Sequence, residues 1–171
     1  MKVGEQIKTF SATVLRVDEK RVRKTFTEAV QRYSMQQMFD NEVGALKRVQ
    51  HLPGFQQLLE YDFPHITTRY CGVELPKSQP DHPADVLQQM EAFVQALDTV
   101  EMVHRDVLPR NILYHEGQLT LIDFTWAYYP GCAFNNINDA PRGLGGRWNP
   151  KGGFSNAYSI DIIKKEWKQH A

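Results

Sequence analysis

A short polar segment between an apolar helix and two small strands constrains this chain more than any other feature. Residues 84–100 predict a helix whose apolar side chains trace one wide face. A loop follows at His104–Asn111, and then two short strands at Ile112–Tyr114 and Leu119–Asp123. Alternation along the second strand puts Asp123 at the end of an apolar row. Polar side chains are therefore expected to gather beside a buried helix and a strand end, and they are the candidates for a functional site.

Two charged side chains nearer the N-terminus lie on predicted apolar faces. Residues 13–26 predict two strands around a turn, and alternation in the second strand puts Lys24 between two hydrophobic residues. Residues 28–50 predict a helix, and Glu42 lies on its apolar stripe. A lysine in such a place can extend its ammonium group to solvent. A glutamate on a buried face needs a cationic partner, because an unpaired buried charge is costly.

The rest of the chain predicts one more short strand, two loops and a last helix. Residues 65–70 predict the strand, and a proline-rich loop follows it. Residues 129–156 are rich in Gly, Pro and Asn and predict a long loop before a helix at about 159–168. Aromatic residues gather in and before this loop: Trp126, Tyr128, Tyr129, Phe134, Trp148 and Phe154. We expect them to cover exposed core, or to line a substrate cleft or a dimer surface.

Composition argues against several classes of protein. Lys plus Arg and Asp plus Glu both number 20, so the formal charge is zero, whereas a phosphate-binding nucleic-acid protein carries a basic surface. Arg21, Arg23 and Lys24 form only a short basic strand with little aromatic interleaving. No apolar run approaches the length of a membrane helix. Cys71 and Cys132 are too few for a disulfide framework, which predicts a cytoplasmic protein.

The polar segment also carries a family resemblance. Val103–Leu113 reads Val-His-Arg-Asp-Val-Leu-Pro-Arg-Asn-Ile-Leu, and Asp123-Phe124 begins twelve residues after Asn111. This arrangement resembles the H-R-D-x-x-x-x-N and D-F-G motifs of the protein-kinase-like superfamily. The strand lysine and the helix glutamate stand upstream in the order that this family has.

The resemblance covers roughly residues 7–163 and implies an α+β, bilobal protein-kinase-like fold. The small β-rich N-lobe with one helix would span about residues 1–70. A truncated, mainly helical C-lobe would span residues 71–171, so that residues 1–171 form a single minimal domain of a bacterial or viral type.

The same resemblance implies a role for each polar residue. Asp106 would be the catalytic base that orients the acceptor hydroxyl. Asn111 and Asp123 would hold Mg²⁺, which prefers such oxygen ligands. Lys24 would contact the α- and β-phosphates of ATP and would itself be held by Glu42. His104 would be architectural, and Arg105 would pair either with a phosphorylated activation loop or in a structural salt bridge.

The resemblance also implies where the adenine lies. Backbone groups of Arg69 and Cys71 would meet its edge at the hinge, with Thr68 at the back of the pocket and Leu113 beneath the ring.

The sequence departs from the family pattern in four places. The stretch Ile7–Val14 stands where the glycine-rich loop is expected, and it contains no glycine. Thr125 replaces the glycine of D-F-G, from which we expect a more fixed Asp123. The A-P-E segment is expected near Arg147–Pro150. The chain ends at a helix that resembles the first large helix after the activation segment, so the later C-lobe helices are expected to be absent.

These residues predict an ATP- and Mg²⁺-dependent phosphotransferase acting on a hydroxyl acceptor. The acceptor is left open between a small molecule or glycan and a protein Ser, Thr or Tyr side chain. Leu108 stands where serine/threonine kinases usually carry a lysine, and Arg110 stands where many tyrosine kinases carry an arginine. The alternative is a pseudokinase that serves as a nucleotide-binding or scaffold module. A homodimer, or a fused or separate partner domain, is also left open.

Overall fold

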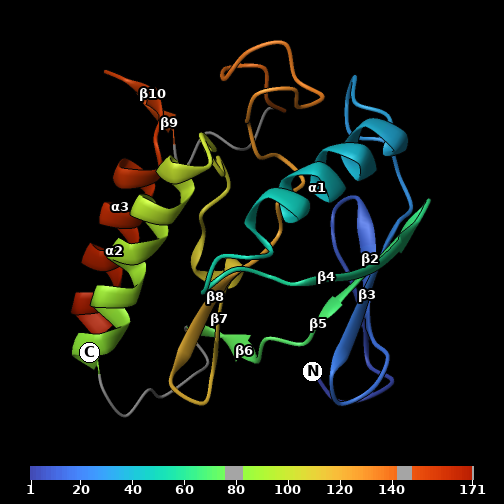
Figure 1. Ribbon diagram of the computed structural model, residues 1–171, viewed down its shortest axis with the longest axis horizontal. Coiled ribbons are helices and arrows are strands. Elements are labelled where there is room, and N and C mark those ends of the chain that lie inside the picture. Colours follow the sequence, from blue (N-terminus) through green and yellow to red (C-terminus); the bar gives the residue numbers. More distant parts are fainter. Residues whose placement is uncertain (76–82, 142–147, 171) are drawn as a thin grey trace.

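A five-stranded antiparallel sheet forms one side of the molecule (Figure 1). The computed structural model describes residues 1–75, 83–141 and 148–170. The strand order is β1-β2-β3-β5-β4. The strands are β1 (Gln6–Lys8), β2 (Ala12–Arg16), β3 (Arg21–Phe26), β4 (Leu58–Asp62) and β5 (His65–Arg69). Lys24 pairs with Val14 on one side and Ile66 on the other, so it lies in the middle of the sheet.

The helix α1 (Met35–Val49) lies beside this sheet (Figure 1). Its buried face carries Met38, Phe39, Val43, Leu46 and Val49, in the spacing that the sequence predicts. The predicted start at residue 28 is wrong. A capping box between Ser34 and Gln37 begins the helix, and Val30 and Tyr33 form an isolated bridge before it.

The opposite side of the molecule is mainly helical. The helices α2 (Pro83–Thr99) and α3 (Asn156–His170) lie side by side (Figure 1). A three-stranded sheet, in the order β6-β7-β8, lies next to α2. Its strands are β6 (Val73–Glu74), β7 (Ile112–His115) and β8 (Gln118–Leu121), and a 3₁₀ turn, η2 (Pro109–Asn111), precedes β7. A small hairpin, β9 (Trp148–Asn149) with β10 (Gly153–Phe154), leads into α3.

Most of the predicted elements are confirmed, with several differences besides the start of α1. The short strands β1, β6, β9 and β10 were not predicted, and the last two lie in the stretch expected to be a long loop. β4 was not predicted, because its side chains are largely exposed and show no alternation of burial. The strand expected to reach Asp123 ends at Leu121, and the last helix begins at Asn156 rather than at Ser159. The proline-rich loop lies mostly outside the described residues, as does part of the A-P-E segment. No described helix has the length and apolar character of a membrane span.

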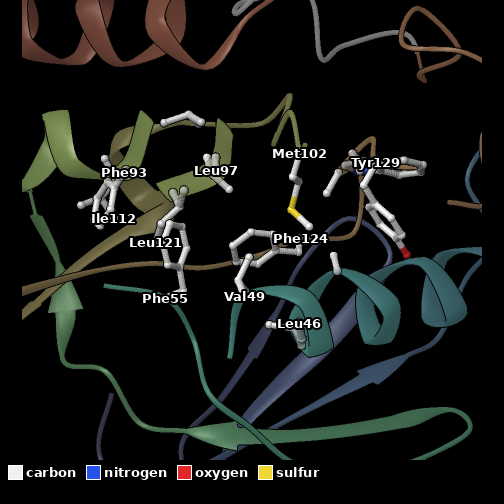
Figure 2. Close-up of a cluster of buried hydrophobic side chains, with 14 of the residues drawn as sticks. Leu46, Val49, Phe55, Phe93, Leu97, Met102, Ile112, Leu121, Phe124 and Tyr129 are labelled. Atoms are coloured by element: carbon white, nitrogen blue, oxygen red, sulfur yellow. The ribbon is translucent and has the colours of Figure 1, made fainter. Parts of the chain in front are cut away.

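One continuous hydrophobic core connects the two sides (Figure 2). Phe124 is fully buried at its centre, and Phe55 packs against both Phe124 and Phe93 of α2, at 6.1 and 5.6 Å between ring centroids. Leu46 and Val49 bring α1 into the same cluster. Because Phe124 directly follows Asp123, the core fixes the position of that carboxylate.

Candidate active site

The ammonium group of Lys24 joins three segments that are far apart in the sequence. Its Nζ donates to Glu42 Oε2 of α1 at 2.7 Å and to Asp123 Oδ1 at 2.8 Å. Its third hydrogen bond, at 2.7 Å, goes to Thr125 Oγ1. The exposed fraction is 14 % for the Lys24 side chain, 2 % for Glu42 and 36 % for Asp123. A half-buried cation is therefore matched by one buried and one partly exposed carboxylate.

The charges of this cluster shift one another's pKa values. Burial opposes the charge of Lys24, but Asp123 and Glu42 together raise the pKa of its ammonium group above the ordinary value. Burial also opposes the charge of Asp123, yet Lys24 outweighs it and holds the pKa of Asp123 at about 2. Burial raises the pKa of Glu42, although Lys24 acts against this. Asp123 is thus the carboxylate that remains ionised most firmly, as a metal ligand must.

A second pair of residues lies on the loop before β7. Asn111 Nδ2 donates to the backbone oxygen of Asp106 at 2.8 Å and to its Oδ2 at 3.1 Å. Burial, together with the negative charge of Asp123, raises the pKa of Asp106 to about 7, and Arg110 acts in the opposite direction. A carboxyl with such a pKa is suited to accept a proton near neutral pH.

The donor set fits Mg²⁺. The amide nitrogen of Asn111 is held by Asp106, which leaves its Oδ1 without a hydrogen bond within the described residues. Asp123 Oδ2 is likewise without a partner there, since the hydrogen bonds from Lys24 and Thr125 to this carboxylate both go to Oδ1. Two protein oxygens are typical of a magnesium site that is completed by phosphates and water. No cluster of three or more His, Cys, Asp or Glu side chains that could hold a metal by itself occurs in the described part of the chain.

His104 and Arg105 hold the loop together. Asp106 N donates to His104 Nδ1 at 3.3 Å, and His104 Nε2 lies 3.0 Å from the carbonyl of Ile122, which fits a neutral ring with its proton on Nε2. Burial lowers the pKa of His104 to about 4, so the ring is neutral. Arg105 is buried and donates to the backbone carbonyls of Trp126, Ile137 and Asp139 at 2.6 to 2.9 Å. These contacts agree with an architectural His104 and differ from both pairings expected for Arg105.

Comparison with solved structures shows what the fold resembles. No family model and no curated protein matches the chain. Among solved structures, the kinase PK-1 of Cydia pomonella granulovirus matches with a TM-score of 0.65 and 15 % sequence identity. The match covers 99 % of this chain and 69 % of the viral protein. The fold is kinase-like. At this identity the likeness shows the fold alone.

The residues expected around the adenine lie on β5, on the segment after it and on β7 of the kinase-like fold. Val22 pairs with Thr68 and Lys24 with Ile66, so Thr68 lies on the same sheet face as Lys24. Thr68 is buried, and its Oγ1 accepts a hydrogen bond from Gln56 Nε2 at 2.8 Å. Arg69 is exposed, Cys71 Sγ donates to the carbonyl of Arg69, and Leu113 is half-buried. Their contact with a nucleotide stays a prediction.

Two residues of the site were not predicted. Asn41 is buried, and its Nδ2 donates to the carbonyls of Thr125 and Ala127 at 3.0 and 2.9 Å. Its Oδ1 accepts from Ala133 N at 3.1 Å, so this side chain fastens the segment after Asp123 to α1. The only sequence signal was a second polar residue beside Glu42 on the helix.

Thr125 is the other unexpected residue. Its Oγ1 lies 2.7 Å from Glu42 Oε2 and 2.8 Å from Asp123 Oδ1, in addition to its contact with Lys24. The replacement of glycine predicted a less mobile backbone at this position. The structure adds a side-chain hydroxyl in the middle of the charged cluster.

Proposed function

We propose that this chain is an ATP-dependent phosphotransferase that moves a γ-phosphoryl group to a hydroxyl acceptor. The observation that carries the proposal is the charged cluster, in which Lys24 is bonded to Glu42 and to Asp123 from two other segments. Phosphoryl transfer depends mainly on positioning and on charge stabilisation, and this cluster supplies both. The acceptor belongs either to a small molecule or glycan, or to a protein side chain.

Each polar residue has a part in the proposed reaction. Lys24 donates to phosphate oxygens and is oriented by Glu42. Asp106 accepts the proton of the acceptor hydroxyl while the acceptor oxygen bonds to the γ-phosphorus and the bond to the leaving ADP oxygen breaks. Asn111 Oδ1 and Asp123 hold Mg²⁺, which when bound neutralises charge on the phosphates. Thr68, Arg69, Cys71 and Leu113 contact the adenine.

We extend the proposal to a two-lobed arrangement of the fold and to the cellular compartment of the protein. The sheet with α1 and the helical side act as two lobes with the nucleotide between them, and the boundary lies near residue 70. Both cysteines are free thiols. Together with the use of ATP, free thiols favour the cytoplasm. A dimer or a partner domain stays a prediction.

A pseudokinase is the second candidate, and the turn between β1 and β2 favours it. This turn stands in the place of a glycine-rich loop, and its side chains include Phe10, which is 81 % exposed. Side chains at Thr9, Phe10 and Ser11 give phosphate less access to backbone N–H groups than glycines would. Such a protein would bind nucleotide, or fail to bind it, without transferring phosphate.

The deciding experiment measures ATP consumption with Mg²⁺, and intact mass before and after, for the wild type, Asp106→Asn and Lys24→Ala. We expect turnover to fall at least a hundredfold in both variants, because each removes a group on which positioning or proton transfer depends. The matched controls are Asp98→Asn and Lys20→Ala, which change exposed residues outside the site. The folded wild type could instead bind ATP without transferring phosphate to water, to itself or to any of a panel of hydroxyl acceptors. In that case the pseudokinase is the better description.

A further inference from the structure

All three N–H groups of Lys24 are used inside the protein. An ammonium group has three donors and no acceptor. Here they go to Glu42, Asp123 and Thr125, at 2.7, 2.8 and 2.7 Å. No donor is left for a phosphate oxygen, so Lys24 can bind a nucleotide only by releasing one of these three partners.

Thr125 is the partner that is released at the lowest cost. Glu42 and Asp123 are carboxylates, and their hydrogen bonds to the ammonium group are assisted by charge on both sides. Thr125 offers a neutral hydroxyl oxygen. A negatively charged phosphate oxygen is a stronger acceptor than this hydroxyl, and it can replace the hydroxyl without separating either ion pair.

The remaining contacts of the Thr125 hydroxyl are with the two carboxylates that also bind Lys24. A hydroxyl group has a single hydrogen, so Thr125 donates either to Glu42 Oε2 or to Asp123 Oδ1. This donation reduces the repulsion between two carboxylates that share one ammonium group. The backbone of Thr125 is held independently, because its carbonyl accepts a hydrogen bond from the buried Asn41.

We propose that Thr125 Oγ1 is an exchangeable ligand of Lys24, which occupies the third donor of the lysine until a phosphate oxygen of the nucleotide takes its place. This proposal rests on nucleotide binding as part of the proposed function, and it does not require turnover. Thr125 keeps the cluster assembled while the site is empty and competes with the nucleotide for Lys24. Removing the hydroxyl should therefore lower the stability of the protein without nucleotide and increase its affinity for nucleotide phosphates.

The test is calorimetric titration of the wild type and Thr125→Val with the non-hydrolysable ATP analogue AMP-PNP in the presence of Mg²⁺, and with adenosine. We expect the Kd of Thr125→Val for AMP-PNP to fall about fivefold, since one exchanged hydrogen bond corresponds to a factor of roughly two to ten. The Kd for adenosine should not change, because adenosine has no phosphate to compete with the hydroxyl. Thermal melts should show a lower Tm without ligand, and a larger gain in Tm with AMP-PNP, for the variant than for the wild type.

Three further variants control the interpretation. Thr125→Ser keeps the hydroxyl and should bind both ligands as the wild type does. Thr125→Ala removes the oxygen without introducing a methyl group beside Lys24, and should shift affinity in the same direction as valine. Thr67→Val changes a buried threonine whose strand partner is Arg23, on the sheet face away from Lys24, and should leave both Kd values unchanged.

The outcomes separate this inference from the proposed function. If the wild type binds AMP-PNP and the valine and alanine variants bind it equally or more weakly, Thr125 is not an exchangeable ligand, and nucleotide binding stands. If the folded wild type binds neither AMP-PNP nor adenosine, the proposed function fails and the inference fails with it.

Discussion

At the scale of single residues, the proposed reaction needs the ionised form of Asp106, and the fold disfavours that form. Its side chain is buried, and burial together with Asp123 raises its pKa to about 7, against an ordinary value of 3.8. A base must be ionised, so the proposed activity should rise with pH through about 7. A carboxyl with a raised folded-state pKa stabilises the fold at pH values below its unfolded pKa, and this contribution is lost as pH rises through the folded pKa.

Asp106→Asn should therefore stabilise the protein at high pH while removing activity. The free energy of unfolding of the variant minus that of the wild type should be larger at pH 8 than at pH 5, by on the order of 2–3 kcal/mol. The reason is that the amide has no charge to bury at high pH, whereas the wild-type carboxyl does. Urea unfolding at the two pH values measures the difference. Asp98→Asn, at an exposed position of α2, should show no such dependence. A variant that is less stable than the wild type at pH 8 would contradict this account of Asp106.

At the scale of elements, α1 connects the sheet to the segment after Asp123. Glu42 bonds to Lys24 of β3, and its neighbour Asn41 bonds to the segment from Thr125 to Ala133. Gly44 allows a close approach here, because a Cβ at this position would lie 2.2 Å from Tyr129 Oη. That hydroxyl in turn donates to the carbonyl of Asn41. The helix and the segment are thus fastened to each other next to the charged cluster.

Asn41→Ala should loosen this attachment. It leaves two carbonyls and one N–H group without their partner, and we expect a loss of roughly 1–3 kcal/mol in the free energy of unfolding. Gln36→Ala changes an exposed position on the same helix and should cost less than about 0.5 kcal/mol. Urea denaturation measures both. Equal stabilities for the two variants would show that Asn41 does not hold the segment.

At the scale of the whole molecule, Arg105 orders a long segment without a phosphate group. Its guanidinium donates to three carbonyls between Trp126 and Asp139 and lies 4.5 Å from the ring centroid of Phe134. Arg32 and Tyr33, which precede α1, both bond to the Asp139 side chain and bring the same segment to the sheet side. The aromatic residues of this loop are mostly buried, in agreement with the expectation that they cover core, whereas Trp148 is exposed.

Activity should therefore be independent of phosphorylation in this segment. Between Phe124 and Pro150 the hydroxyl residues are Thr125, Tyr128 and Tyr129, of which the first and the last are buried. We expect phosphatase treatment, verified by intact mass, to leave ATP turnover unchanged. Arg105→Met should instead lower stability by roughly 2 kcal/mol or more, because three backbone carbonyls lose their donor, two of them in buried hydrogen bonds. A loss of turnover on dephosphorylation alone would contradict this prediction.

The sequence by itself determined the local elements and the order of the polar residues. The apolar spacing of α1 and α2, and the alternation that puts Lys24 on an inner face, depend only on helical and strand periodicity, which neighbouring residues express directly. The resemblance of residues 103–124 to kinase motifs, with Lys24 and Glu42 upstream in the family's order, implied a kinase-like fold, which the likeness to a solved kinase structure supports. β4 was not predicted, because a strand with mostly exposed side chains does not need the alternation of apolar and polar residues that identifies a half-buried strand.

The tertiary structure alone decided which atoms meet around Lys24. Its bonds to Asp123 and Thr125 span 99 and 101 residues, and no local periodicity predicts which hydroxyl or carboxylate oxygen fills a given donor. Arg105 could equally have met a carboxylate or a phosphate, and only the path of the chain through residues 126–139 brings carbonyls to it. Hydrogen bonds depend on positions within tenths of an ångström, and those positions are set by the packing of the whole core around Phe124.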